Sequence, residues 1–298
     1  MKPSAPTVTA VANWYGSARM VAERIGPELG KRSLVVVPFA GGMSELPYID
    51  AGKLLVNDRH RHLVNLARVL SDPHLGLALY RRLRREVFHP DTLAAAQGRC
   101  SGREMEFCDE GSLFNSSLGD RRHAALAHLE WAADYAICTW MGRGGRSGTE
   151  GEFRQGLPIR YSPNGGGSAQ RFHNWVASIP AWRRVLRRCE FATDDALDVI
   201  AACHDSARCG IYCDPPWPDV GDKYTHADNY AFQRRIASAL SRFTAARVVV
   251  RYADHPLIRE LYPRDRWTWL TYPSRAQTND KFDEVLILNG ASRVAEVA

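Results

Sequence analysis

Four consecutive residues, Asp214, Pro215, Pro216 and Trp217, have the clearest potential for chemistry in this sequence. They end an apolar run at 210–213, so that an acid closes a buried strand. A proline after Asp214 favours an extended backbone, which fixes the carboxylate. This carboxylate and the Pro215 carbonyl can accept hydrogen bonds from an exocyclic amine and direct its lone pair at an electrophile. Trp217 can stack on the base that carries the amine, worth about 1–3 kcal/mol; the alternative is a turn that only stops the strand.

A second candidate site follows the apolar run at 34–37. Glycine lets the backbone turn sharply and approach a ligand closely, and ligands of open α/β sheets bind at the carboxyl ends of strands. A structural turn is the alternative. The loop consists of Pro38, Phe39, Ala40, Gly41 and Gly42, with Ser44 just beyond it.

Asp58 closes the next apolar run, at 54–56. An acid in this position commonly binds the ribose hydroxyls of a nucleoside cofactor. It could instead cap the helix that follows. The glycine loop and Asp58 together favour the nucleoside interpretation.

Two further groups are weaker candidates. Trp14, Tyr15 and Gly16 near the N-terminus are candidates for cofactor binding; the alternative is an aromatic anchor that packs on the core. Lys223, Tyr224 and His226 could form a lip over the site at 214–217 that contacts nucleic acid, or they could be ordinary surface residues.

The formal net charge of +6 is concentrated between residues 142 and 188, where Glu150 and Glu152 are the only acids. The glycine-rich first part of this segment is too polar to be core, and long loops of this kind are usually functional or disordered. Arginines contact phosphates, so the segment predicts a nucleic-acid surface; a solvated face is the alternative. The candidate residues are Arg143, Arg146, Arg154, Arg160 and Arg171.

The elements that must position these residues alternate between strand and helix. Apolar runs at 34–37 and 54–56, with a helix-period stretch at 63–70, are typical of an open α/β sheet. Helical stretches at 76–88 and 123–142 interrupt this pattern. It then returns in the last third of the chain. We expect a strand and a helix in 189–200, a strand before 214, a helix in 229–244, and strands in 246–253, 266–274 and 282–290.

Composition excludes several other classes. The 298 residues, 45% of them hydrophobic, suffice for a large core. The sequence contains no run of eighteen apolar residues, so we expect no membrane-spanning helix. Seven cysteines without a CxxC pair argue against zinc and suit a reduced, cytoplasmic protein. No cysteine follows a proline, which argues against cytosine C5 methylation, and we expect Cys213 to point into the core.

The order of these features resembles that of the Dam-type, alpha-group N6-adenine DNA methyltransferases, in particular their phage-like branch. The resemblance covers nearly the whole chain. Three departures are a Trp in place of the usual Tyr after the second proline, a shifted second glycine in the loop, and a missing N-terminal lysine. The matching residues are Trp14 and Gly16, the loop at 38–42, Asp58, Asp214-Pro215-Pro216-Trp217 and the segments at 160–182, 248–263 and 282–289.

The resemblance implies a Rossmann-like class I methyltransferase sheet, mostly parallel with one antiparallel strand near the C-terminus. Residues 1–74 and 189–298 would form the core, and residues 75–188 an inserted, mainly helical target-recognition lobe. S-adenosylmethionine would bind along the glycine loop with its ribose on Asp58, and Asp194 or Asp195 would meet its adenine. A bacterial or phage-encoded enzyme, monomeric or weakly dimeric, would methylate N6 of an adenine flipped out of double-stranded DNA.

Two alternatives stay open. Residues 214–217 suit any planar exocyclic amine, so an enzyme acting on RNA adenine or on cytosine N4 fits them equally well. A catalytically decayed nucleic-acid-binding relative would also explain the altered glycine loop and the missing lysine.

Overall fold

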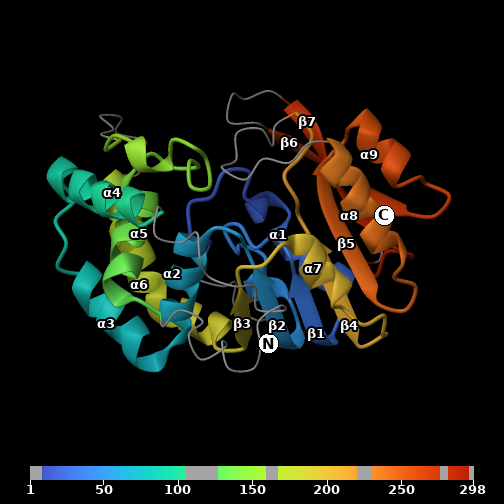
Figure 1. Ribbon diagram of the computed structural model, residues 1–298, viewed down its shortest axis with the longest axis horizontal. Coiled ribbons are helices and arrows are strands. Elements are labelled where there is room, and N and C mark those ends of the chain that lie inside the picture. The colour runs from blue at the N-terminus through green and yellow to red at the C-terminus, as the bar shows by residue number, and fades with distance from the viewer. Residues whose placement is uncertain (1–8, 105–126, 159–166, 220–229, 276–280, 295–298) are drawn as a thin grey trace. The chain divides into compact units, whose positions relative to one another are not determined.

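The computed structural model describes residues 9–104, 127–158, 167–219, 230–275 and 281–294 (Figure 1). The helices are α1 (Ala22–Leu29), α2 (Arg61–Ser71), α3 (Pro73–Leu83), α4 (Pro90–Glu104), α5 (Leu129–Met141), α6 (Ser168–Leu186), α7 (Ala196–Ala201), α8 (Tyr230–Ser241) and α9 (Pro256–Leu261). The strands are β1 (Arg32–Val37), β2 (Ala51–Asn57), β3 (Cys189–Ala192), β4 (Cys209–Cys213), β5 (Arg247–Ala253), β6 (Thr268–Arg275) and β7 (Lys281–Leu288). Every strand and helix predicted from the sequence patterns is present, whereas α1, α4, α6 and α9 were not predicted.

The seven strands form one sheet in the order β3-β2-β1-β4-β5-β7-β6. β1 pairs in parallel with β2 and with β4, and β4 pairs in parallel with β5. β7 runs antiparallel to both of its neighbours, β5 and β6. The expected α/β sheet, mostly parallel with one antiparallel strand near the C-terminus, is therefore confirmed.

The chain divides into two compact units, each built from several segments. The first comprises residues 1–17, 41–47 and 60–193, and the second comprises residues 18–40, 48–59 and 194–298. Helices α2 to α6 belong to the first unit. Strands β1, β2 and β4 to β7, with helices α1 and α7 to α9, belong to the second.

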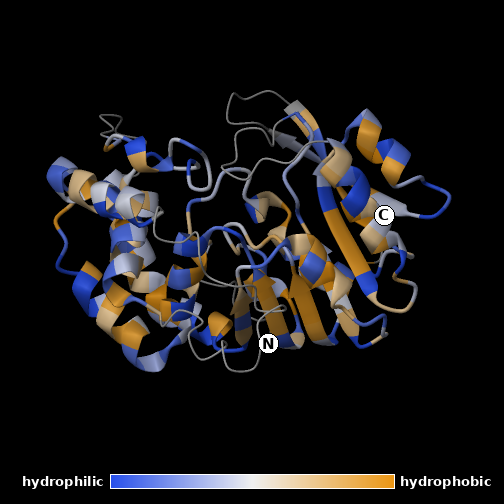
Figure 2. Ribbon diagram, viewed as in Figure 1, coloured by the Kyte–Doolittle hydropathy of each residue, from blue (hydrophilic) through white to orange (hydrophobic). Residues whose placement is uncertain are grey.

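The core of the second unit lies between α8 and one face of the sheet. Phe232, Ile236 and Leu240 of α8 pack with Ile211 of β4 and Val250 of β5, and all five are buried. The strands are apolar along their middle, as the orange ribbons of β4 and β5 show (Figure 2). Because successive side chains of a strand point to opposite faces, β5 presents its two arginines to the other face.

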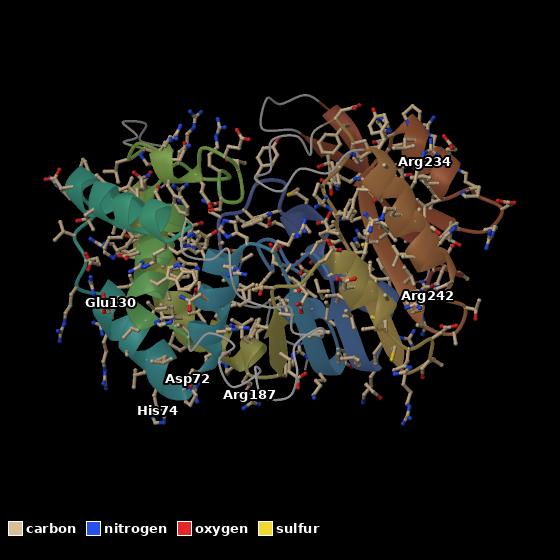
Figure 3. All side chains as sticks on the ribbon, in the orientation of Figure 1. Asp72, His74, Glu130, Arg187, Arg234 and Arg242 are labelled. Atoms are coloured by element: carbon tan, nitrogen blue, oxygen red, sulfur yellow. The ribbon has the colours of Figure 1, made fainter. Side chains whose placement is uncertain are left out.

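Helix α8 is also tied to α7 by a polar contact. Arg242, next to the end of α8, donates hydrogen bonds to the carbonyls of Ile200, Ala201 and Cys203 at the end of α7 (Figure 3). The carbonyls at the carboxyl end of a helix carry partial negative charge, so a cation there is favourable. The contact fixes the helix that precedes β4.

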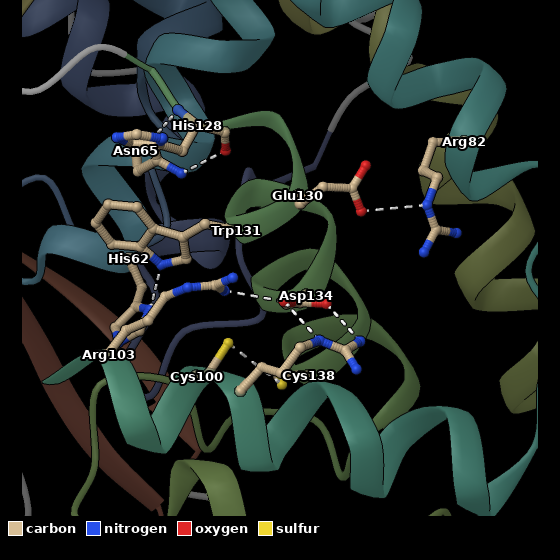
Figure 4. Close-up of polar contacts among 11 residues, drawn as sticks. His62, Asn65, Arg82, Cys100, Arg103, His128, Glu130, Trp131, Asp134 and Cys138 are labelled. Atoms are coloured by element: carbon tan, nitrogen blue, oxygen red, sulfur yellow. Dashed lines mark hydrogen bonds and ion pairs between the residues drawn. The ribbon is translucent and has the colours of Figure 1, made fainter.

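The first unit is helical and holds several polar groups in its interior. Asp134 of α5 is 2% exposed and accepts hydrogen bonds from Arg99 and Arg103 of α4 (Figure 4). The indole N–H of Trp131 donates to Nδ1 of His62 at 2.5 Å. Burial, with the charges of His60 and Arg103, lowers the pKa of His62 to about 2, so this side chain is a neutral acceptor.

The prediction that the glycine-rich segment after residue 142 is too polar to be core was wrong for its first part. Ser147, Thr149, Glu152 and Phe153 are all buried. Their polar groups are satisfied locally: Glu152 accepts from the Gly148 amide at 2.8 Å and pairs with His60 at 2.5 Å. Internal hydrogen bonding removes the cost of burying polar groups, which composition alone does not reveal.

Candidate active site

The carboxyl ends of β1 and β4 lie side by side in the second unit. The two strands are parallel, and Val36 is opposite Ile211. The chain therefore leaves β1 at Pro38 next to the point where it leaves β4 at Asp214. The strand order also reverses between β1 and β4, and open α/β sheets bind ligands outside the carboxyl ends of strands at this switch point.

Asp214 is held from three sides. Nη1 of Arg251 donates to its Oδ2 at 2.8 Å, and the Tyr212 hydroxyl donates to the same oxygen at 3.4 Å. The indole N–H of Trp217 donates to Oδ1 at 3.3 Å. Since each carboxylate oxygen accepts about two hydrogen bonds, the contacts made by described residues leave acceptor capacity on Oδ1. The Asp214 side chain is 18% exposed, so this oxygen can meet a ligand.

Arg251 links Asp214 to a second carboxylate. Its Nε and Nη2 contact Oε2 of Glu284 at 2.9 and 2.8 Å, and the Ser274 hydroxyl donates to Oε1 of Glu284 at 2.7 Å. The guanidinium carbon also lies 4.7 Å from the centre of the Trp217 ring, a cation–π distance. Arg251 therefore contacts both the acid and the aromatic ring of the predicted catalytic motif.

Burial and the guanidinium act in opposite directions on the acid. Burial raises the pKa of Asp214, and the neighbouring charge of Arg251 opposes that rise. Burial alone would lower the pKa of Arg251, but the carboxylates of Asp214 and Glu284 overcome this, so its pKa is raised. The arginine is permanently charged, and the ion pair favours the carboxylate form of Asp214.

The turn after Asp214 is fixed by a separate buried relay. Gln233 of α8 donates to the Pro216 carbonyl at 2.6 Å and accepts from the Tyr252 hydroxyl at 2.6 Å. Gln233 and Tyr252 are both fully buried. No donor among the described residues contacts the Pro215 carbonyl, the one that we assign to the amine.

Asn57, the last residue of β2, joins the chain that follows β1 to the chain that follows β3. Its amide donates to the Pro38 carbonyl at 2.9 Å and to the Asp194 carbonyl at 3.1 Å, and its carbonyl accepts from the Asp194 amide at 2.8 Å. The Ala40 amide donates to the Asn57 carbonyl. Phe39 is half-buried and meets the edge of Phe232. One buried side chain thus holds the start of the glycine loop beside the end of β2.

Asp58 does not cap the helix that follows, which was the alternative to cofactor binding. His60 is the N-cap of α2, and its Nδ1 accepts from the Leu63 amide. Asp195, in contrast, caps α7 through the Leu197 amide, and Asp194 is buried. Asp58 lies directly after β2, the position expected of an acid that binds a ribose.

In the first unit, the Trp14 side chain lies so close to several backbone positions that only glycine fits there. A Cβ at Gly41 or Gly42 would lie 3.1 Å from atoms of Trp14, and a Cβ at Gly148 would lie 2.5 Å from its ring. Gly41 and Gly148 also have positive φ angles of 46° and 82°, which glycine adopts without strain. The indole therefore packs on glycine backbones, as expected of an aromatic anchor.

The other N-terminal candidates have structural contacts within the same unit. The Tyr15 amide donates to the Ser147 carbonyl. Ser44 is buried, with its hydroxyl 3.3 Å from that of Ser17. Gly16 is exposed and has a φ of 66°.

The predicted nucleic-acid residues fall into two groups. Arg143, Arg146 and Arg154 are exposed, whereas Arg171 is half-buried. Arg160, Lys223, Tyr224 and His226 lie outside the described residues.

Sequence reasoning missed Arg251, Glu284, Gln233 and Asn57. One signal was available: Arg251 interrupts the apolar run of β5, and a charged residue in a central strand is almost never fully buried without a partner. Its partner Glu284 is 33 residues away, and only the pairing of β5 with β7 brings them together.

Comparison with protein-family models and with curated proteins finds no match for this chain. No helix in the described ranges is long and apolar enough to cross a membrane. The same ranges contain no group of three or more His, Cys, Asp or Glu side chains that could hold a metal ion.

Proposed function

We propose that this protein is an S-adenosylmethionine-dependent methyltransferase that acts on an exocyclic amine, with N6 of adenine in double-stranded DNA as its target. One observation carries this proposal. The Asp-Pro-Pro-Trp motif leaves β4 at the switch point of an open sheet, next to the Pro38-Phe39 turn that leaves β1.

The second unit contains a set of residues suited to the cofactor. The backbone from Pro38 to Ala40 would lie beside it, and Asp58 would accept hydrogen bonds from its ribose hydroxyls. Asp194 and Asp195 begin the adjacent loop after β3. When bound, S-adenosylmethionine would supply a methyl group on a positively charged sulfur. The resemblance adds Trp14 and the glycine loop of the first unit to this set.

The residues around Asp214 are suited to an amine. Oδ1 of Asp214 and the Pro215 carbonyl would each accept one N–H, which aligns the nitrogen lone pair. Trp217 would stack on the base. Holding the nitrogen in a reactive geometry contributes much of the rate enhancement in reactions of this type, and no covalent bond to the protein is required.

The helical first unit contains the predicted target-recognition lobe. Its exposed arginines, Arg143, Arg146 and Arg154, would contact DNA phosphates. Neutralising phosphates releases counterions, so binding should weaken steeply as salt increases. We expect a monomer or weak dimer, because a flipped base needs only one active site.

Methylation of DNA from a methylation-free host tests this function directly. The purified protein would be incubated with S-adenosylmethionine and with DNA or RNA of matched sequence, and the products digested to nucleosides. N6-methyl-2′-deoxyadenosine from DNA supports the proposal. N4-methyl-2′-deoxycytidine, or a product from RNA only, identifies the alternative substrates. Cofactor binding without any product would favour the decayed relative.

A further inference from the structure

Arg251 is a buried cation with an unusual set of partners. Its side chain is 2% exposed and lies in β5, between Val250 and Tyr252. Burying a cation is costly unless the charge is paired and hydrogen-bonded. Here it is paired with two carboxylates and covered by an aromatic ring, all at the end of the sheet that carries the predicted motif.

We propose that Arg251 is a positioning residue of the active site, which keeps Asp214 an ionised acceptor and sets the plane of Trp217 for stacking. This inference rests on the proposed function. It goes beyond it by assigning a role to a residue outside the Asp-Pro-Pro-Trp motif.

The charge of Asp214 depends mainly on Arg251, because burial and Glu284 raise the pKa of Asp214 and the Trp217 hydrogen bond lowers it less than Arg251 does. A protonated Asp214 would lose acceptor capacity that the amine requires. Removing the guanidinium would leave burial and Glu284, both of which favour protonation. Among the described residues, the titratable or charged groups near Asp214 are Tyr212 and Cys213 of β4, Arg251 and Tyr252 of β5, and Glu284 of β7.

The geometry couples the acid to the ring. Arg251 contacts Asp214, the Asp214 carboxylate accepts from the Trp217 indole, and the Arg251 guanidinium lies over the Trp217 ring. This triangle restrains the ring in two ways, through its N–H and through one of its faces. Phe282 also meets Trp217, with ring centres 5.9 Å apart and an interplanar angle of 69°, so the orientation of the ring is set before a base arrives.

Glu284 holds Arg251 from the side away from Asp214. It is buried and is itself fixed by the Ser274 hydroxyl. A planar guanidinium can contact both carboxylates and still stack on an indole, whereas the ammonium of a lysine has no such planar fork. The two substitutions Arg251→Lys and Arg251→Met therefore separate charge from geometry.

The test compares methyl transfer and its pH profile in wild type, Arg251→Lys, Arg251→Met and Arg251→Met/Glu284→Gln. Arg247→Met is the matched control, since Arg247 is also a buried arginine of β5 paired with a carboxylate, Glu28. We expect kcat of Arg251→Met to be lower than that of wild type by on the order of 100-fold. We also expect its kcat to begin falling toward acid at a higher pH than that of wild type. Arg251→Lys should lose kcat but keep the wild-type pH profile.

The double variant guards against misfolding and misassignment. Arg251→Met/Glu284→Gln lacks the buried charge of Glu284 that Arg251→Met leaves unpaired. If activity still falls at the same acidic pH in this double variant, the group that titrates is Asp214. Arg247→Met should keep the wild-type kcat per folded molecule and the wild-type profile. Unchanged kcat and pH profile in folded Arg251→Met would overturn the proposal, as would an equal loss in Arg247→Met.

A readout without catalysis separates this inference from the proposed function. The carboxyl of Asp214 would be titrated by NMR with carbon-13-labelled aspartate and assigned with Asp214→Asn. If the pKa of Asp214 is higher in Arg251→Met than in wild type, and is close to the wild-type value in Arg251→Lys, the role of Arg251 is supported even if no methylation is found. Identical titrations in wild type and Arg251→Met would refute that role even if the wild type methylates DNA.

Discussion

The two ends of strand β5 carry the same kind of group in different settings. At the amino end, Arg247 pairs with the Glu28 carboxylate of α1 through Nη2, and its Nε and Nη2 also donate to the backbone carbonyls of Glu28 and Ala291. At the carboxyl end, Arg251 pairs with Glu284 and with Asp214. Glu28 is fully buried, whereas the Asp214 side chain is 18% exposed and lies beside Trp217.

This difference separates a structural ion pair from one that can serve a ligand. Every contact of Arg247 is internal, and burial lowers its pKa although Glu28 opposes this. The Arg251 network ends instead on an oxygen with spare acceptor capacity, at the edge of the sheet where ligands bind. Location in the sheet, rather than the ion pair itself, therefore indicates function.

The largest effect should come from removing the acid at the carboxyl end. Asp214→Ala is expected to abolish methyl transfer, a loss of more than about 1,000-fold, because both orientation and electrostatic stabilisation of the amine are lost. Cofactor binding, measured by calorimetry, should largely persist. Normal turnover by this variant would contradict the assignment of the site.

The matching change at the amino end should affect stability instead. Glu28→Gln leaves Arg247 buried without its carboxylate, which should lower the free energy of unfolding by about 3–5 kcal/mol. Denaturant unfolding measures the loss. Activity per folded molecule should stay at the wild-type level. A loss of activity without a loss of stability would mean that the Arg247 ion pair also serves the active site, which would contradict the distinction between the two ends of β5.

Substitution of Trp217 tests the aromatic side of the carboxyl end. Trp217→Ala should weaken binding of DNA with an unpaired target adenine by about 1–3 kcal/mol, the value of one stacked base. Trp217→Phe keeps a ring but loses the N–H to Asp214, so it should retain most of the binding and less of kcat. If Trp217→Ala bound as tightly as wild type, the ring would be only structural.

The smallest expected effect is the loss of stability at mildly acidic pH. It tests whether a buried histidine, and not either ion pair of β5, sets the pH dependence of the free energy of unfolding. His62 is neutral in the folded protein with a pKa of about 2, while an unfolded histidine has a pKa near 6.5. The unfolded chain therefore binds the extra proton, and the free energy of unfolding should fall by about 1.4 kcal/mol per pH unit below about 6.5. His62→Gln should reduce this slope in denaturant titrations at pH 5 to 7, whereas Glu28→Gln should not.

The local elements were predictable because their signals are local. Strands β1, β2, β4 and β5 are short apolar runs, and α2 and α8 show a helical spacing of apolar residues, so each was recognised from its own sequence. The burial of Cys213 was also predicted correctly. The interior of the first unit was not, since Glu152 is buried only because Gly148 and His60 satisfy it.

The sequence by itself determined the prediction of the chemistry. An acid followed by two prolines and a tryptophan predicts an amine ligand from the residue types and their immediate backbone alone, before any tertiary contact is known. It also determined the open α/β class through its alternating patterns.

Only the tertiary structure decided which residues support that chemistry. The hydrogen bonds that Arg251 donates to Asp214 and to Glu284, and that Gln233 donates to Pro216, join residues 17 to 37 positions apart. Such contacts depend on strand order and on the face to which each side chain points. Neither can be read from a single strand, because a buried arginine is equally compatible with the structural role of Arg247 and with the role that we propose for Arg251.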